Sequence, residues 1–585
     1  MVRLRDHGLH LLLMGLVQGV VFAAIWRTAD LQGDVSLPIR LVVDLLAGIP
    51  LLVYATEQVP GLTTRPRALI VATLTAIGVA LQEYTHWVFD STTWGSWFPQ
   101  GLLPTLMLLF VSVHWWVHWR RANPSHHAYR DLFDTTWRNA ILCGLGVGLT
   151  GLFWGVLFAG AQLFKLIGID ALQDLIEQSW FAIPASTTVF ACVVTLGLQR
   201  EDMIISLRKL LLGLLKWFLP LVLLIATVWA VCLPFTGVST LFKSASAAWT
   251  MLATVALSVL FANAAFQDGS QERPYPRVPG LILSWMWLAL IPVAAIAIWA
   301  LSLRIGQYQW TAERAWGFLV ALIALGYAIG YSISLWPLRR NADSHWMPGI
   351  AGTNRVMAVL MVIGIVVLAS PLGDAFRLQA SSQTARTLAM PSAPAGKPLP
   401  LDLGFISGTG RWGERAATRL QSATASDPSV DRSIRTLLPA QLATIRERSK
   451  PPAKMTKGAP QLVSVNPSMQ QAQLWAWLQG QTGTDNMEHR KLQACWSAQP
   501  CRVYWLDLNR DGVAEALLFE GALQTMPAVY TWEHDEAKYM GSLSVPVRAG
   551  GSSVPLLPLL EAGKVELVPN PWQRVKVNDL EFELN

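Results

Sequence analysis

Apolar segments of membrane-spanning length recur from Gly8 to about Leu372 and then stop. A helix that crosses a hydrocarbon core of about 30 Å needs roughly 20 mostly apolar residues. Each such segment has to be helical, because lipid offers the backbone amides no other hydrogen-bond partner. The charged fraction of 14% agrees, since ordinary soluble domains carry about 25% charged residues. The sequence therefore predicts an α-helical polytopic membrane domain over residues 1–372.

Eleven segments satisfy this length requirement, so we expect about 11 transmembrane helices. Their first residues lie near Gly8, Leu37, Arg67, Pro99, Asn139, Trp180, Leu211, Ser246, Leu281, Arg314 and Val356. Lys and Arg gather in alternate loops, which indicates that those loops are cytoplasmic. An odd number of spans with a cytoplasmic N-terminus places the C-terminal region outside. We expect a multi-pass protein of the bacterial inner (cytoplasmic) membrane with a periplasmic C-terminal domain.

The region after the last span has the composition of a water-soluble domain. Residues 373–400 are rich in Ala, Ser, Thr and Pro, which is typical of a linker. In residues 401–585, helical patterns come first and strand-like runs dominate after Arg502. We therefore expect a C-terminal soluble α+β domain.

Two cysteines of this domain, Cys495 and Cys501, lie six positions apart. In an oxidising compartment such a pair is expected to form a disulfide that closes a short loop. The alternative is two buried free thiols.

A loop in the same domain has the pattern of a calcium site. Oxygen-bearing side chains alternate before Gly512, and a glycine there permits a sharp turn around a hard cation. The twelfth loop position is Leu518, not the Glu of an EF-hand, so the pattern is closer to strand-loop-strand calcium loops. The alternative is a metal-free Asp-Gly hairpin. The candidate ligands of a structural calcium ion are Asp507, Asn509, Asp511 and Glu515.

Ionisable residues inside spans are candidate functional groups, because burying a charge in lipid is costly. Asp44 lies within the second predicted span, with Arg40 one turn earlier as a partner. Glu83 and His86 lie near the end of the third span and are expected at the level of Asp44. One interpretation is an intramembrane proton or cation relay of Asp44, Glu83 and His86. The other is an interfacial ion pair that only fixes the helix.

Two further motifs have structural interpretations. Residues 146–151 match a dinucleotide fingerprint but lie inside an apolar span without a preceding strand. Pairs of glycines four residues apart instead predict close helix packing. These pairs are Gly144 with Gly148, Gly151 with Gly155, and Gly326 with Gly330. His114 and His118 are one helical turn apart, which suits a shared metal, but the neighbouring Trp residues favour an interfacial belt.

Several stretches between Arg130 and Leu372 resemble an uncharacterised bacterial membrane family known as domain of unknown function 4153. The resemblance implies a polytopic inner-membrane protein and brings no activity or catalytic residues with it. It does not cover the soluble extension. The stretches are 163–169, 233–237, 263–269, 275–277 and 304–314.

No segment combines a nucleophile with a base, so we expect no catalytic residues. The leading hypothesis is a non-enzymatic envelope scaffold or sensor whose periplasmic domain binds an envelope protein, polymer or other ligand. A second is a secondary transporter that uses Asp44, and a third is a membrane enzyme acting on lipid-linked envelope material. The net charge of +7 lies mostly in cytoplasmic loops, so we exclude nucleic acid as a partner and expect the lipid bilayer instead.

Overall fold

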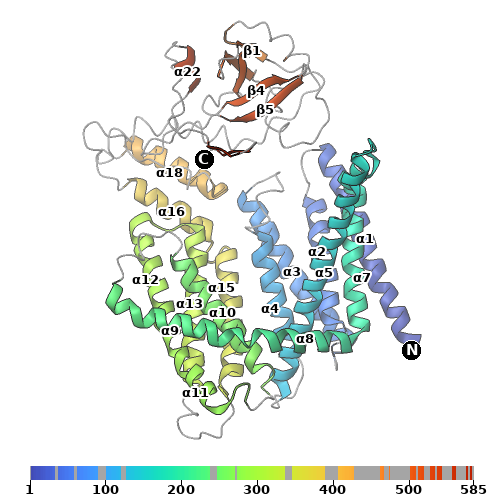
Figure 1. Cartoon of the computed structure of the whole chain (residues 1–585), viewed down its shortest axis with the longest axis vertical. Coiled ribbons are helices and arrows are strands. Elements are labelled where there is room, and N and C mark those ends of the chain that lie inside the picture. Colours follow the sequence, from blue (N-terminus) through green and yellow to red (C-terminus); the bar gives the residue numbers. More distant parts are fainter. Residues whose placement is uncertain are drawn as a thin grey trace. The chain divides into compact units, whose positions relative to one another are not determined.

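The computed structural model divides the chain into two compact units. One contains residues 1–386 and 409–416, and the other contains residues 387–408 and 417–585. Figure 1 shows the helices of the first unit and the small sheet of the second. The structure describes residues 2–582 except 33–36, 58, 60–61, 90–100, 120–126, 238–246, 270–272, 336–345, 389–405, 407, 427–461, 467–473, 475–500, 509–511, 520–526, 534–535, 543–555, 562–574 and 578–579.

The first unit is helical. Its first half consists of α1 (Val2–Gln32), α2 (Leu37–Thr56), α3 (Thr64–Phe89), α4 (Leu103–Trp119), α5 (His127–Lys165), α6 (Ala171–Glu177) and α7 (Ser179–Gln199). Its second half consists of α8 (Glu201–Leu215), α9 (Phe218–Thr236), α10 (Ala247–Phe266), α11 (Arg277–Met286), the 3-10 helix η3 (Trp287–Ala289), α12 (Leu290–Tyr308), α13 (Ala312–Ile333), α15 (Ile350–Ala369) and α16 (Ala375–Leu388). The helix α18 (Arg411–Ser426) begins in this unit.

Ten helical segments among the described residues are long and apolar enough to cross a membrane. They are α1, α2, α3, α5, α7, α8 with α9, α10, α11 to α12, α13 and α15. The fourth predicted span corresponds to α4, which has 17 residues and falls short of that length. The helical membrane architecture agrees with the sequence, whereas the count of eleven is not confirmed.

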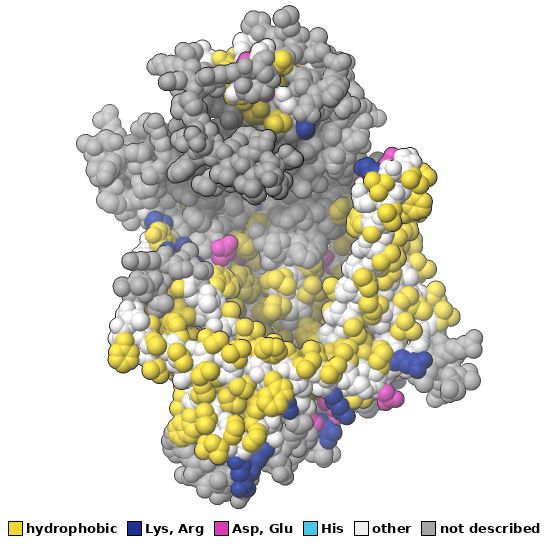
Figure 2. Space-filling view, viewed as in Figure 1, with side chains coloured by type: hydrophobic (Ala, Val, Ile, Leu, Met, Phe, Trp, Pro, Cys, Tyr) yellow, Lys and Arg dark blue, Asp and Glu magenta, His cyan; other side chains and the backbone are white. Residues whose placement is uncertain are grey.

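The predicted span near Leu211 differs in direction from its neighbours. In Figure 1, α8 and α9 run across the other helices of the unit instead of alongside them. The helix α8 begins with Glu201 and Asp202, and Lys216 and Trp217 separate it from the apolar α9. Figure 2 shows hydrophobic side chains over α9 and α11 and charged ones along the lower edge of that face. The segment stays one of the ten that are long and apolar enough to cross a membrane, although it does not run alongside the other helices.

Glycines decide how closely some helices approach. A Cβ atom on Gly326 would lie 2.6 Å from Met357 Cε, and one on Gly330 would lie 2.4 Å from Thr353 Cγ2. This pair therefore packs α13 against α15, as predicted. The predicted packing of the α5 glycines is not observed, because a Cβ there would meet no described atom within 4 Å. These glycines are Gly144, Gly148, Gly151 and Gly155.

A closed hydrogen-bond network joins four helices in the core of the second half. Asn354 of α15 donates to Tyr129 Oη of α5 (2.7 Å) and to Asn263 Oδ1 of α10 (2.6 Å). Tyr331 of α13 donates to Asn354 Oδ1 (2.5 Å) and accepts from Asn263 Nδ2 (2.9 Å). Asn263 Nδ2 also donates to the carbonyl of Val259 (2.8 Å). All donors and acceptors of the two amide groups have partners, as burial in an apolar bundle requires.

The region predicted as a linker begins with the helix α16, which packs on the loop between α12 and α13. Gln379 Oε1 accepts from the backbone amide of Ala312 (2.7 Å), and Gln383 Nε2 donates to the carbonyls of Tyr308 (2.9 Å) and Trp310 (3.0 Å). Ala375, Phe376 and Leu378 also pack with Ala312 and Ala315, so polar and apolar side chains together hold α16 in place. The polar side chains gave the segment the composition of a linker.

One buried carboxylate anchors the start of α16. Asp374 Oδ1 accepts from the backbone amide of Phe376 (2.9 Å), and its Oδ2 accepts from Tyr84 Oη and Trp412 Nε1, both at 2.5 Å. Trp412 also meets the Trp87 ring edge-on, with centroids 5.7 Å apart. The first turns of α18 are thereby fastened to the end of α3.

The second unit contains a five-stranded sheet in the order β1-β2-β3-β4-β5. The pair β1 and β2 is parallel, and the later neighbours are antiparallel. The described residues of this unit also include a helix, a separate hairpin and the end of α18. The bounds are β1 Leu462–Ser464, β2 Cys501–Leu506, β3 Glu515–Phe519, β4 Ala528–Glu533, β5 Glu536–Ser542, α22 Leu556–Glu561, β6 Val575–Val577 and β7 Leu580–Phe582.

The central strand β3 is buried along its whole length, and Leu517 and Phe519 pack with Leu557 and Leu560 of α22. Strands after Arg502 and a helix at the start of the region agree with the predicted α+β class. Cys501 begins β2 and is buried, while Cys495 lies outside the described residues. The disulfide between them therefore stays a prediction.

Candidate functional site

The helices α2 and α3 lie side by side in a register that two contacts define. Arg40 forms a two-pronged ion pair with Glu83, with Nη2 to Oε2 at 3.2 Å and Nε to Oε1 at 3.4 Å. Further along, a Cβ on Gly48 would lie 3.6 Å from Thr75 Cγ2. Asp44 lies midway between Arg40 and Gly48, so it faces α3 between Thr75 and Glu83. The partner of Arg40 in these contacts comes from the next helix, and the predicted pair of Arg40 with Asp44 stays a prediction.

Polar atoms without a hydrogen-bond partner among the described residues lie on both of these helices. Asp44 Oδ2, Thr75 Oγ1 and both amide atoms of Gln82 are buried and make no hydrogen bond with the described residues. Gln82 is only 4% exposed. Leaving such groups buried and unsatisfied costs about 1–3 kcal/mol each. Asp44 is the titratable carboxylate of this set.

The predicted relay residues share one electrostatic environment. The charges of Glu83 and Arg40 act on both Asp44 and His86. We use the name α2–α3 polar strip for six residues of these two helices: Arg40, Asp44, Thr75, Gln82, Glu83 and His86. Its ends on α3, Thr75 and His86, lie about 16 Å apart at 1.5 Å per residue. The strip therefore covers about half of a hydrocarbon core of about 30 Å.

Thr75 and Gln82 were missed because the sequence search considered only ionisable groups. Their spacing of seven residues places them on one face of α3, and Gly78 and Thr85 share that face. Gly101, just before α4, comes close to it, since a Cβ there would lie 2.9 Å from Thr85 Cγ2 and 3.1 Å from Gln82 Oε1. Neutral polar residues at helical spacing would have indicated this face of α3. The spacing would not have shown that the Thr75 hydroxyl and the Gln82 amide have no hydrogen-bond partner among the described residues.

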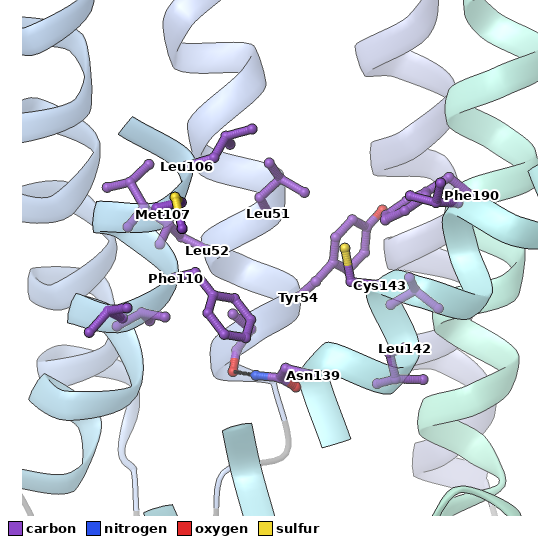
Figure 3. A pocket seen from close by; sticks show the side chains of 16 residues that line it. Leu51, Leu52, Tyr54, Leu106, Met107, Phe110, Asn139, Leu142, Cys143 and Phe190 are labelled. Carbon is purple, nitrogen blue, oxygen red and sulfur yellow. Dashed lines mark hydrogen bonds between the residues drawn. The ribbon is translucent and has the colours of Figure 1, made fainter. Parts of the chain in front are cut away.

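A cavity of about 510 Å³ lies between α2, α4, α5 and α7 (Figure 3). Leu51 and Leu52 line it from α2, Met107 and Phe110 from α4, and Phe190 from α7. Its walls are almost entirely apolar. Such a cavity suits a hydrocarbon chain rather than a polar ligand.

Asn139, which also lines this cavity, belongs to a second group of polar residues. In Figure 3, Asn139 donates to the carbonyl of Ala55 (2.9 Å). Its Nδ2 also lies 3.0 Å from His114 Nε2, while His114 Nδ1 lies 2.5 Å from the carbonyl of Phe110. A carbonyl only accepts, so Nδ1 carries the proton and Nε2 is the acceptor. Both ring nitrogens of His114 are occupied, which argues against the metal site with His118, a side chain outside the described part.

The ion pair of Arg67 and Glu57 lies beside this second group. Arg138 Nη2 donates to the carbonyl of Glu57 (3.1 Å), and Arg67 Nε donates to Thr56 Oγ1 (3.2 Å). Here the polar groups are paired, in contrast with Asp44 Oδ2, Thr75 Oγ1 and the amide of Gln82, which have no partner among the described residues. The pairing favours a structural role for this end of α2.

The candidate calcium loop is described in part. Asp507 Oδ2 accepts from the amide of Gly512 (3.0 Å), and its Oδ1 is buried without a hydrogen bond among the described residues. Glu515 is 5% exposed and accepts through Oε2 from the amide of Leu508 (2.7 Å). The other two candidate ligands, Asn509 and Asp511, lie outside the described residues, so the site stays a prediction. An unsatisfied buried carboxylate oxygen at Asp507 fits a cation.

No protein-family model, curated protein or solved structure matches the chain. The resemblance to the membrane family of domain of unknown function 4153 therefore stays a proposal, carried by the short stretches quoted above. The apolar helices do indicate a protein of the membrane, and the α2–α3 polar strip is its best-supported candidate site.

Proposed function

We propose that this multi-pass protein binds and exchanges a proton or a small cation at the α2–α3 polar strip, as a secondary transporter does. The observation that carries the proposal is the set of buried polar atoms that have no hydrogen-bond partner among the described residues: Asp44 Oδ2, Thr75 Oγ1 and the amide of Gln82. Polar groups inside a membrane helix bundle are normally satisfied by neighbours. A bound proton or cation would satisfy such groups.

The chemistry of the set suits a proton or a hard monovalent cation. Carboxylate, hydroxyl and amide oxygens are hard donors, and Asp44 alone among the three can carry the charge that balances the cation or accept the proton. The nearby charge of Glu83 is offset by its ion pair with Arg40. Asp44 is therefore the group whose charge changes during exchange, and Thr75 and Gln82 position the bound species.

The orientation expected from the basic loops places the His86 end of the strip toward the periplasm. The strip then opens to the outside, and along α2 it is followed by Leu51 and Leu52 of the apolar cavity, which Asn139 also lines. This order, polar then apolar then polar, is that of a pathway that is closed in one state. No comparable set of unsatisfied groups among the described residues supports the hypothesis of a scaffold or sensor. The same holds for the hypothesis of an enzyme acting on lipid-linked material.

The first experiment measures reaction of Asp44 with dicyclohexylcarbodiimide in the purified full-length protein. Carbodiimides modify protonated carboxyl groups in apolar surroundings, and mass spectrometry of peptides identifies the residue. We expect modification of Asp44 that falls when the pH rises or when Na⁺ is added. Glu83 and Asp134 are internal controls, since each is held in an ion pair with an arginine. Absence of modification at Asp44, or modification that neither pH nor Na⁺ changes, would contradict exchange at this site.

A second variant separates ligand binding from structure. Gln82→Leu removes the unsatisfied amide while keeping a similar volume, so the protein without ligand should become more stable. The same change should abolish the Na⁺ or pH effect on Asp44. Thr227→Val is a matched control, because the Thr227 hydroxyl bonds only within its own bundle, to the carbonyls of Leu223 (2.7 Å) and Met286 (3.5 Å). A Gln82→Leu protein that keeps the full protection of Asp44 would show that Gln82 takes no part.

A further inference from the structure

Three guanidinium groups converge on one tyrosine at the loop between α12 and α13. Arg304, Arg314 and Arg386 lie 5.9, 5.7 and 5.7 Å from the centroid of the Tyr308 ring. They come from the end of α12, the first turn of α13 and the last turn of α16. Three separate elements therefore direct positive charge to one point.

Hydrogen bonds hold two of these arginines in place. Arg314 Nη1 donates to the carbonyls of Tyr308 (3.3 Å) and Gln309 (2.6 Å), and Arg386 Nη1 donates to that of Tyr308 (3.3 Å). Gln309 has a φ of +62°, a conformation that L-residues seldom adopt and that surrounding contacts have to maintain. The loop is therefore a built structure and not a surface on which long side chains happen to meet.

Two of the three arginines have no ion-pair partner among the described residues. Neither Arg314 nor Arg386 forms an ion pair with a carboxylate of the described residues, and Glu313 is the acidic residue in the first turn of α13. A guanidinium has five N–H donors, and the carbonyl contacts of Arg314 and Arg386 use Nη1 of each. The three guanidinium charges repel one another. The π ring of Tyr308 compensates part of this repulsion, and a bound anion would compensate more.

The position of the cluster also calls for a ligand. It lies at the Tyr308 end of the segment that starts at Arg277, so it is at the opposite end of the bundle from that basic loop. Arginines are depleted at this end by the charge rule that orients membrane proteins. Trp310 and Tyr308 belong to residue types that prefer the headgroup level of a bilayer.

We propose that Arg304, Arg314 and Arg386 form a binding site for a phosphate-class anion, with Tyr308 as the surface on which the guanidiniums are ordered. Arginine suits this ligand because its planar fork matches two phosphate oxygens at once. The phosphate belongs either to the headgroup of an anionic phospholipid or to a free anion. The site is separate from the α2–α3 polar strip and does not depend on exchange there.

The test uses the full-length protein with two probes. In neutral detergent, inorganic phosphate is titrated and binding is followed by calorimetry. In nanodiscs, phosphatidylglycerol is compared with phosphatidylcholine, and the lipid retained by the protein is measured by native mass spectrometry. Arg386→Gln is the main variant, because Arg386 makes one carbonyl contact where Arg314 makes two. Arg377→Gln is the matched control, since Arg377 lies on the same helix but stacks on Trp412 at 5.4 Å.

We expect Arg386→Gln to weaken binding of the phosphate group about tenfold, as loss of one charged hydrogen-bonding group does. Arg386→Lys should retain part of the affinity, because the charge remains while the fork is lost. Binding of inorganic phosphate identifies a free-anion site, and selective retention of phosphatidylglycerol alone identifies a headgroup site. The proposal is overturned if neither probe binds, or if Arg377→Gln weakens binding as much as Arg386→Gln does.

Discussion

The hydrogen-bond network around Asn354 should stabilise the helical bundle measurably. The change Asn354→Leu keeps the approximate volume of the side chain but removes hydrogen bonds to Tyr129, Asn263 and Tyr331. Side-chain hydrogen bonds in membrane proteins contribute about 0.6 kcal/mol on average and up to about 1.7 kcal/mol. Three lost bonds therefore amount to about 2 kcal/mol at the average value, which raises the unfolding equilibrium constant about thirtyfold.

The assay is reversible unfolding of the purified full-length protein in mixed micelles, with SDS as the denaturant and tryptophan fluorescence as the readout. Tyr327→Phe is the matched control, because the Tyr327 ring packs on Tyr331 at 5.6 Å while its hydroxyl makes no hydrogen bond with the described residues. Asn263→Leu should also destabilise the protein. Since Asn263 and Asn354 share one bond and one partner, the double variant should cost less than the two single variants together.

An Asn354→Leu protein as stable as the wild type would refute this reasoning. Such a result would mean that packing of the leucine side chain stabilises the protein as much as the hydrogen-bond network does. This happens when some buried polar groups are replaced by apolar ones. Strictly additive effects of the two Leu substitutions would also contradict a shared network.

Two further predictions concern helix packing at the glycines and the candidate calcium loop. Gly330→Ala should destabilise the bundle by about 1–3 kcal/mol in the same unfolding assay, because the new methyl group would overlap Thr353. Gly148→Ala should be neutral or slightly stabilising, because no described atom lies within 4 Å of its Cβ position. Calcium should raise the thermal unfolding midpoint of the C-terminal unit of the full-length protein, and Asp507→Ala should abolish that shift. An equal midpoint with calcium and with a chelator in the wild type would reduce the loop to a metal-free hairpin.

Much of the architecture was readable from the amino-acid sequence. Most predicted spans coincide with helices, and the change of composition near Leu372 separates the helical part from the strands that follow Arg502. The differences have local causes. The fourth predicted span corresponds to α4, which is too short, and α16 is held by Gln379 and Gln383 together with apolar contacts where no apolar repeat indicated a helix.

The candidate sites were readable only in part. Asp44, Glu83 and His86 stood out as charges within apolar segments, and the structure brings them into one electrostatic environment. The partner of Arg40 and the role of Gln82 could not be predicted, because both depend on which residues of α2 and α3 face each other. The convergence of arginines on Tyr308 likewise needs α16, whose contribution comes from more than 70 residues away in the chain.

The sequence by itself determined that most of this chain is built of apolar helices and that its C-terminal part is a separate α+β module. This follows from composition along the chain, because a helix satisfies its own backbone and needs only length and hydropathy to be recognised. The tertiary structure alone decided which polar groups are satisfied and which are left without a partner. Register between helices sets those contacts, and a shift of one residue along either helix would change every partner across the interface.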